Sequence, residues 1–285
     1  MLWFLIAKIY DHIYSLFKAV FKRNLKGIGF LLRQVKNDHI LDLNGQQLYF
    51  NHKIAGCYVR LVNGKYTEIE THTFIQRIVE RFDKEMTFID IGANVGEMVL
   101  DAARHENIKF IYAFEPHPEC AKACKISAML NDYGQKIVVI QKVLSEDTKP
   151  VAFDFNTISP NASAIAISSD KQGSMVYPTT LDNELPNTIE HAILLIDVEG
   201  AELRVIKGGK SFIGRTLPLI IFEYNDTSKK YFTLENIKQL LGGEYSIFRL
   251  RNDGYLDKNY IDTWNCVAIN IRSSFYNPVK AFIRD

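Results

Sequence analysis

The chain has 285 residues, enough for one α/β domain with additions or for two small domains. Hydrophobic residues make up 47% of it, which can supply a full core, and the net charge of +1 argues against nucleic acid as a partner. The four cysteines, Cys57, Cys120, Cys124 and Cys266, lack metal-site spacing, so we expect buried thiols in a reducing cytoplasm.

The amino-terminal segment, residues 1–39, is expected to begin with an amphipathic helix over residues 1–23. Polar side chains interrupt its apolar run, so the helix is too broken to span a membrane. It also lacks the features of a signal peptide, which predicts a cytoplasmic protein. Two interpretations remain. The basic end at Lys18, Lys22 and Arg23 favours peripheral contact with a membrane surface, and the alternative is packing on the protein's own domain or on a homodimer partner.

Residues 40–70 are expected to form a small antiparallel β cap. Two Asn-Gly pairs, Asn44-Gly45 and Asn63-Gly64, are typical of hairpin turns. A helix is predicted from about His72 to Phe82, at the start of a main domain over residues 71–285.

The stretch from Thr87 to Gly96 organises this domain. It begins as an apolar strand of the kind buried on both faces, and a helix follows from Glu97 to Ala103. We expect Gly92 and Gly96 to let a ligand approach the backbone, since neither has a Cβ, and Asn94 to adopt a left-handed conformation. The Gly-x-x-x-Gly spacing matches neither the dinucleotide motif nor a phosphate loop.

The second strand, Lys109 to Phe114, ends at Glu115 and is closed by Pro116. An acidic residue at the tip of the second strand can accept both ribose hydroxyls of a nucleoside. Together with Asp90 and the glycine turn, Glu115 predicts a nucleoside site without a phosphate-reading group. That combination suits S-adenosylmethionine, which has no phosphate.

Further elements follow in alternation. A helix is predicted over Pro118 to Asp132, a third strand over Lys136 to Gln141 and an edge strand over Val151 to Phe155. Residues 156–178 are polar and rich in Ser and Asn, and we interpret them as a candidate substrate loop.

Acidic residues follow the next buried strand, Ala192 to Ile196. Ligands of open α/β sheets bind at the carboxyl ends of the strands, so Asp197 and Glu199 are candidate functional residues. Glu202 is expected only to complement a helix dipole. The fifth strand ends at Glu223, which brings another acid to the same edge.

The last elements are a helix near Leu234 to Leu241 and strands near Ser246 to Leu250 and Cys266 to Ile269. This alternation with a late hairpin predicts an α/β fold with a doubly wound, seven-stranded, mostly parallel sheet.

The ordered motifs resemble the FkbM family of S-adenosylmethionine-dependent methyltransferases, over roughly Glu70 to Ile269. The matching segments are Phe88 to Gly96, Phe114-Glu115-Pro116, Val143-Leu144-Ser145, Thr180-Leu181-Asp182 and Ile196 to Glu202. The resemblance implies a Rossmann-like class I methyltransferase fold. The cofactor-binding residues that it implies are Asp90, Gly92, Ala93, Asn94, Gly96, Glu115, Pro116, Ser145 and Asp197.

The resemblance also implies O-methylation of a hydroxyl on a small-molecule or glycan acceptor, such as a sugar or secondary metabolite. An alcohol needs a base, for which we select Asp197 or Glu199, with Glu223 as an orienting acid. A divalent metal ion on Asp197 and Glu223 is an open alternative, and His72 is a further candidate base.

Two other functions stay in view. A non-catalytic S-adenosylmethionine-binding or scaffold protein would lack the acids Asp197 and Glu199, and their presence favours an enzyme. A nicotinamide oxidoreductase would share Glu115, but the glycine spacing argues against it.

Overall fold

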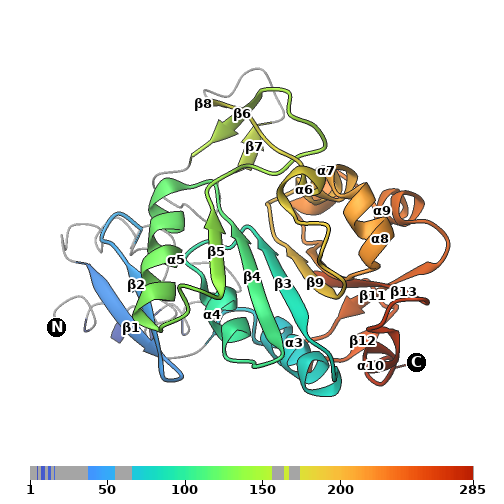
Figure 1. The fold of residues 1–285 in the computed structure, drawn as a ribbon, viewed down its shortest axis with the longest axis horizontal. Helices are drawn as coiled ribbons and strands as arrows, with labels where there is room; N and C mark the ends of the chain where they lie inside the picture. Colours follow the sequence, from blue (N-terminus) through green and yellow to red (C-terminus); the bar gives the residue numbers. More distant parts are fainter. Residues whose placement is uncertain are drawn as a thin grey trace.

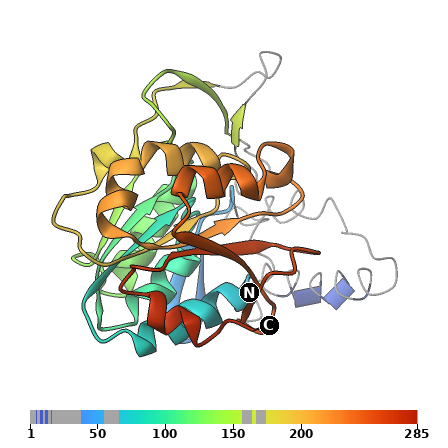
Figure 2. The same ribbon diagram turned by 90° about the vertical axis from the view of Figure 1, so that its right-hand side faces the viewer.

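The protein is described here by a computed structural model that covers residues 38–54, 66–155, 164–166 and 174–284, with isolated helical positions between residues 5 and 16. A central sheet lies between two layers of helices (Figure 1), and the view turned by 90° shows helices on both of its sides (Figure 2). None of the helices in these ranges is long and apolar enough to cross a membrane.

The sheet has eight strands in the order β12-β11-β13-β10-β9-β3-β4-β5. Five of them are parallel neighbours: β3 (Met86–Ile91), β4 (Ile108–Phe114), β5 (Ile137–Ile140), β9 (Ala192–Ile196) and β10 (Leu219–Glu223). The antiparallel part consists of β13 (Asn265–Asn270), β11 (Tyr245–Leu250) and β12 (Leu256–Asp257). The predicted doubly wound sheet is confirmed. The additional eighth strand, β12, is too short to show a periodic pattern.

The order of the strands reverses between β3 and β9, which are neighbours although β4 to β8 separate them along the chain. At such a switch point the connections leave toward opposite sides of the sheet and open a crevice at the carboxyl ends of the strands. All residues of both strands are buried, as their apolar composition predicts.

Helices on one face share a core with the sheet: α3 (Ile69–Arg81), α4 (Glu97–Ala103), α5 (Pro118–Leu130) and α10 (Tyr276–Lys280). The other face carries α6 (Leu181–Glu184), α7 (Glu202–Gly208), α8 (Lys210–Thr216) and α9 (Leu234–Leu241), and a 3-10 turn, η3, covers Ser228–Lys230. The two faces therefore bury separate apolar cores, with the sheet as the wall between them.

A hairpin of β1 (His39–Leu43) and β2 (Gln46–Phe50) turns at Asn44-Gly45 as predicted. It lies beside α5, where Ser127 Oγ accepts a hydrogen bond of 2.9 Å from the Tyr49 backbone N–H. The second predicted turn, at Asn63-Gly64, lies outside the described residues. The carboxyl end of the predicted cap is wrong, because α3 already begins at Ile69. The division into domains stays a prediction.

The segment interpreted as one substrate loop contains two short strands. β7 (Ala164–Ala166) and β8 (Ser174–Val176) flank β6 (Val151–Asp154) in a small antiparallel sheet. The prediction of β6 as an edge strand is therefore wrong, since it is central in a separate sheet. Of the cysteines, Cys120, Cys124 and Cys266 are buried as expected, and Cys57 lies outside the described residues.

Candidate active site

A cavity of about 660 Å³ opens at the carboxyl ends of the parallel strands. Its walls come from the tips of β3, β4, β9 and β10, from the segment that leads into α3, and from the start of β13. Small-molecule sites of about 300–1,000 Å³ are common at such switch points. The cavity is therefore the candidate active site.

Most of the residues predicted for the site line this cavity. They are Asp90, Gly92, Ala93, Asn94, Glu115, Pro116, Asp197, Glu199 and Glu223. Gly96 and Ser145 do not line it. Gly96 precedes the first turn of α4, and Ser145 is buried, with its backbone N–H donating to Thr179 O.

The turn after β3 has the geometry expected of it. Asn94 has a φ of 51°, in the left-handed region, and its backbone N–H donates to Glu115 Oε2 at 2.8 Å. Glu115 Oε1 accepts a second hydrogen bond, of 2.6 Å, from the His117 backbone N–H. Burial raises the pKa of Glu115 to about 7, although both hydrogen bonds favour its charged form. Glu115 thus joins the tip of β4 to the turn.

Glu115→Ala is expected to weaken binding of S-adenosylhomocysteine by about 1–3 kcal/mol, the range for a hydrogen bond to a charged group. Titration calorimetry measures this directly, with Glu80→Gln on the exposed side of α3 as the control. Unchanged affinity in Glu115→Ala, with the fold intact, would show that this carboxylate does not contact the cofactor.

The two glycines also have a structural reason that was not predicted. A Cβ on Gly92 would lie 1.8 Å from the backbone oxygen of Asp197, and a Cβ on Gly96 would lie 2.7 Å from Cys124 Sγ. Both glycines also have positive φ, 94° and 91°. The missing side chains therefore make room for the backbone that follows β9 and for α5, and approach of a ligand to Gly92, which lines the cavity, stays a prediction.

The acids of the fourth and fifth strands meet as predicted. One carboxylate oxygen of Asp197 lies within 4.8 Å of one carboxylate oxygen of Glu223. Burial, together with repulsion from Glu223, raises the pKa of Asp197 well above its ordinary value. Burial, with repulsion from Glu199 and Glu202, raises the pKa of Glu223 to about 9. Near neutral pH the pair therefore holds a proton in the absence of a cationic ligand.

The cavity lining is strongly acidic. Its carboxylates are Glu68, Glu70, Asp90, Glu97, Glu115, Asp197, Glu199 and Glu223. The only lysine or arginine in the described lining is Lys142, which forms an ion pair with Glu184 at 2.6 Å. Asp90 is 2% exposed, and its Oδ2 has no hydrogen-bond partner among the described residues. This balance favours a cationic ligand, such as the sulfonium and ammonium groups of S-adenosylmethionine.

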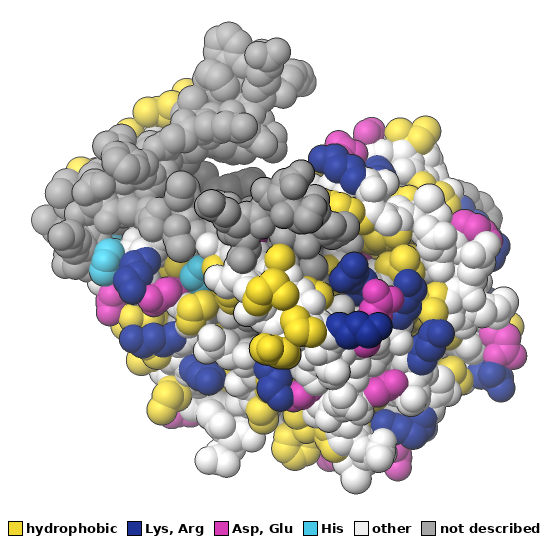
Figure 3. Space-filling model, turned by 90° about the horizontal axis from the view of Figure 1, so that it is seen from above, with side chains coloured by type: hydrophobic (Ala, Val, Ile, Leu, Met, Phe, Trp, Pro, Cys, Tyr) yellow, Lys and Arg dark blue, Asp and Glu magenta, His cyan; other side chains and the backbone are white. Residues whose placement is uncertain are grey.

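The surface seen from above contrasts with this lining. Figure 3 shows basic, acidic and hydrophobic side chains interspersed on the part of this face that is coloured. The excess of acidic side chains is thus a property of the cavity lining and not of the coloured part of this face.

Two groups of lining residues were not predicted from the sequence. Glu68, half-buried at the amino end of α3, accepts from Asn265 Nδ2 at 2.8 Å. Asn265 and its neighbour Trp264 reach the cavity because β13 is antiparallel and pairs Asn265 with Glu223. Because β13 is antiparallel to β10, it begins at the edge of the sheet where β10 ends. This rule could have placed Trp264 and Asn265 at the cavity.

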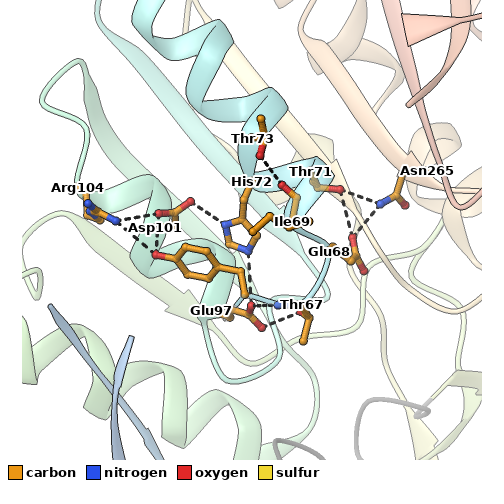
Figure 4. Close-up of polar contacts among 11 residues, drawn as sticks. Thr67, Glu68, Ile69, Thr71, His72, Thr73, Glu97, Asp101, Arg104 and Asn265 are labelled. Atoms are coloured by element: carbon orange, nitrogen blue, oxygen red, sulfur yellow. Dashed lines mark hydrogen bonds and ion pairs between the residues drawn. The ribbon is translucent and has the colours of Figure 1, made fainter. Parts of the chain in front are cut away.

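His72 belongs to a polar network behind the cavity wall, shown in Figure 4. It is 4% exposed, its Nδ1 lies 2.7 Å from Asp101 Oδ2, and its Nε2 lies 3.6 Å from Glu97 Oε1. The ring of Tyr66 stacks on it at 3.9 Å between centroids. Glu97 also accepts from the hydroxyl of Thr67 at 2.8 Å. The network therefore holds residues 66–70, which form one wall of the cavity, against α4.

Burial alone would lower the pKa of His72, but Asp101 and Glu97 outweigh it and raise the pKa to about 9. The imidazole is therefore protonated at neutral pH and does not line the cavity. The structure does not favour His72 as the general base, because its imidazole is buried and does not line the cavity.

This network predicts a pH-dependent stability. A histidine pKa raised from 6.5 to about 9 contributes about 3 kcal/mol to the unfolding free energy. The contribution is complete below pH 6.5 and is lost as the pH rises through 9, since the folded state binds the proton more tightly. We expect urea unfolding to show this loss for the wild type and not for His72→Gln. His52→Gln, outside the network, is the control, and equal pH slopes in all three proteins would contradict the prediction.

Comparison with known proteins decides the family. Residues 90–261 match the family model described as the methyltransferase FkbM domain, which is more than half of the chain. The chain belongs to the FkbM methyltransferase family. This places the matched domain among the S-adenosylmethionine-dependent methyltransferases and makes S-adenosylmethionine its cofactor. It also agrees with the motifs recognised in the sequence and disfavours a nicotinamide oxidoreductase.

Several solved structures match the chain at low identity. The FkbM methyltransferase of Methylobacillus flagellatus is 14% identical, with a TM-score of 0.46, and the match covers 85% of this chain and 57% of that one. M. jannaschii TYW2, solved with AdoMet, is 13% identical, with coverages of 87% and 88% and a TM-score of 0.42. A ribosomal protein L11 methylase from Lactobacillus delbrueckii is 16% identical, with coverages of 72% and 80% and a TM-score of 0.42. No curated protein matches the sequence.

Proposed function

We propose that this FkbM methyltransferase transfers the methyl group of S-adenosylmethionine to a hydroxyl oxygen of a sugar, glycan or secondary metabolite. The observation that carries the proposal is the group of carboxylates at the cavity wall, Asp197, Glu199 and Glu223. An alcohol becomes a good nucleophile only when its proton is accepted, and an ionised carboxylate with a raised pKa is an effective acceptor.

The remaining lining supports this assignment. The orphaned Oδ2 of Asp90 and the carboxylate of Glu115 suit the donor groups of the cofactor. Trp264 lines the cavity and is 52% exposed, so its face is free to pack against the apolar side of a sugar ring. The acidic walls favour a neutral acceptor over an anionic one.

The reaction in this proposal is a direct displacement. The acceptor oxygen attacks the methyl carbon, the carbon–sulfur bond breaks to give S-adenosylhomocysteine, and the hydroxyl proton passes to the carboxylate pair. Holding oxygen, carbon and sulfur in line supplies much of the rate, and the fixed turn after β3 serves that positioning.

The test is incubation of the full chain with S-adenosylmethionine labelled in its methyl group and a panel of neutral sugars, glycans and phenols. We expect equal amounts of S-adenosylhomocysteine and of an O-methylated product, identified by mass and by NMR. Labelling only at nitrogen or carbon would refute O-methylation. Binding of S-adenosylhomocysteine without transfer to any hydroxyl acceptor would support the scaffold alternative.

The amino-terminal residues 1–23 remain a proposal for peripheral membrane contact, with a homodimer as the alternative. Leu5, Ile9, Ile13 and Leu16 are all exposed at helical positions, which suits an apolar face that something covers. We expect the full chain to co-sediment with anionic vesicles and the Ile9→Glu, Ile13→Glu double variant to stay in the supernatant. Lys8→Gln is the control for charge. A stable dimer that does not co-sediment with vesicles, and that dissociates in the double variant, would favour the homodimer interpretation.

A further inference from the structure

Three carboxylates from three elements meet at the inner end of the cavity. Asp197 follows β9, Glu202 begins α7 and Glu223 ends β10, and one oxygen of each lies within 4.8 Å of the other two. Ligands on opposite sides of an ion with bonds of about 2.1–2.4 Å are about 4.2–4.8 Å apart. The three oxygens are therefore close enough for small side-chain movements to bring them onto a single ion.

A second observation concerns Glu202, which is fully buried at 0% exposure. Its Oε1 accepts hydrogen bonds from the backbone N–H groups of Val198 at 3.2 Å and Gly200 at 3.1 Å. Its Oε2 has no hydrogen-bond partner among the described residues. A buried carboxylate oxygen is costly unless a donor or a cation faces it.

A third observation is that no described cationic side chain neutralises these three carboxylates. Within the described ranges, no lysine, arginine or histidine forms an ion pair with Asp197, Glu202 or Glu223. Buried acids are normally paired with a cationic side chain or with a metal ion. The methyl donor cannot satisfy Glu202 directly, because Glu202 does not line the cavity.

We propose that Asp197, Glu202 and Glu223 bind one divalent cation of the Mg²⁺ or Mn²⁺ type. Three carboxylates form an all-oxygen ligand set, which selects hard cations over those that prefer nitrogen or sulfur. Glu202 holds the ion from behind, while Asp197 and Glu223 line the cavity. Coordination positions on the cavity side stay open to water or to the acceptor hydroxyl.

The role of the ion rests on the proposed O-methylation, although its binding does not. A bound cation lowers the pKa of a coordinated hydroxyl and orients its oxygen. The hydroxyl proton then leaves to a carboxylate that is not a ligand, for which Glu199 at the cavity wall is available. Glu202, assigned by the sequence only to the helix dipole, thus gains a binding role.

Direct binding of Mn²⁺ tests the site without any acceptor. The full chain, stripped with chelator, is titrated with Mn²⁺ while the EPR signal of the free ion is recorded. We expect one saturable site per chain, with affinity reduced at least about tenfold in Glu202→Gln and in Asp197→Asn, because ligand charge sets cation affinity. Glutamine retains the Oε1 that accepts from Val198 and Gly200, so the loop is preserved.

The matched control is Glu199→Gln, which removes a nearby carboxylate that is not among the three. Its Mn²⁺ affinity is expected to fall much less than that of Glu202→Gln. Absence of a saturable site in the wild type, or equal affinities in Glu202→Gln and Glu199→Gln, overturns the proposal. Methyl transfer that continues in chelator overturns the catalytic role of the ion and leaves the proposed function intact, whereas Mn²⁺ binding without O-methylation contradicts only the proposed function.

Discussion

Asp197→Asn is expected to slow methyl transfer by about 100-fold or more, the effect of losing a general base or a metal ligand. Asp197 lies at the cavity wall close to Glu223, and asparagine has nearly the same shape without the charge. Affinity for S-adenosylhomocysteine is expected to persist. Single-turnover measurements with labelled cofactor and an identified acceptor separate the chemical step from binding.

Glu199→Gln distinguishes the two ways in which Asp197 can act. If Asp197 accepts the proton itself, Glu199→Gln keeps most of the methyl-transfer rate. If Asp197 binds a metal ion instead, Glu199 accepts the proton, and both Asp197→Asn and Glu199→Gln are slow. Wild-type rates in both variants would place the base elsewhere in the cavity. It would not pass to His72, which is buried, protonated and outside the lining.

The parts of this fold that sequence could predict are those with a local physical cause. The strands β3 and β9 are continuous apolar runs, because a parallel strand covered on both faces buries every side chain. Asn94 takes the left-handed conformation that its side chain tolerates. Since parallel strands end at one edge, the acids that follow them, such as Glu115 and Asp197, were correctly placed around one cavity.

Other features depend on contacts between segments far apart in the chain. Asn265 meets Glu68, 197 positions away, only because β13 returns antiparallel beside β10. The charge state of His72 follows from Asp101 and Glu97 on the neighbouring α4, and no local pattern around His72 shows them. The orphaned oxygen of Glu202 likewise depends on which donors the folded loop leaves for it.

Gly92 illustrates the same limit at a motif that was recognised. The sequence identified the glycine and attributed it to ligand approach, and the structure adds a contact with the backbone of Asp197 that was not predicted. The Asp197 N–H donates to Ile91 O at 2.9 Å, so the backbone at Asp197 is held by the pairing of β3 and β9. It cannot move away from a new methyl group without breaking that pairing.

Gly92→Ala is therefore expected to lower the unfolding free energy by about 4 kcal/mol, the sum of a left-handed alanine and an overpacked contact. Gly45→Ala is the matched control, because Gly45 also has positive φ, 82°, but has no atom within 4 Å of a built Cβ. It should cost only about 1 kcal/mol. Urea unfolding of the two variants measures the difference. Equal losses would refute the backbone contact, and a stable Gly92→Ala that no longer binds S-adenosylhomocysteine would favour the ligand-approach explanation.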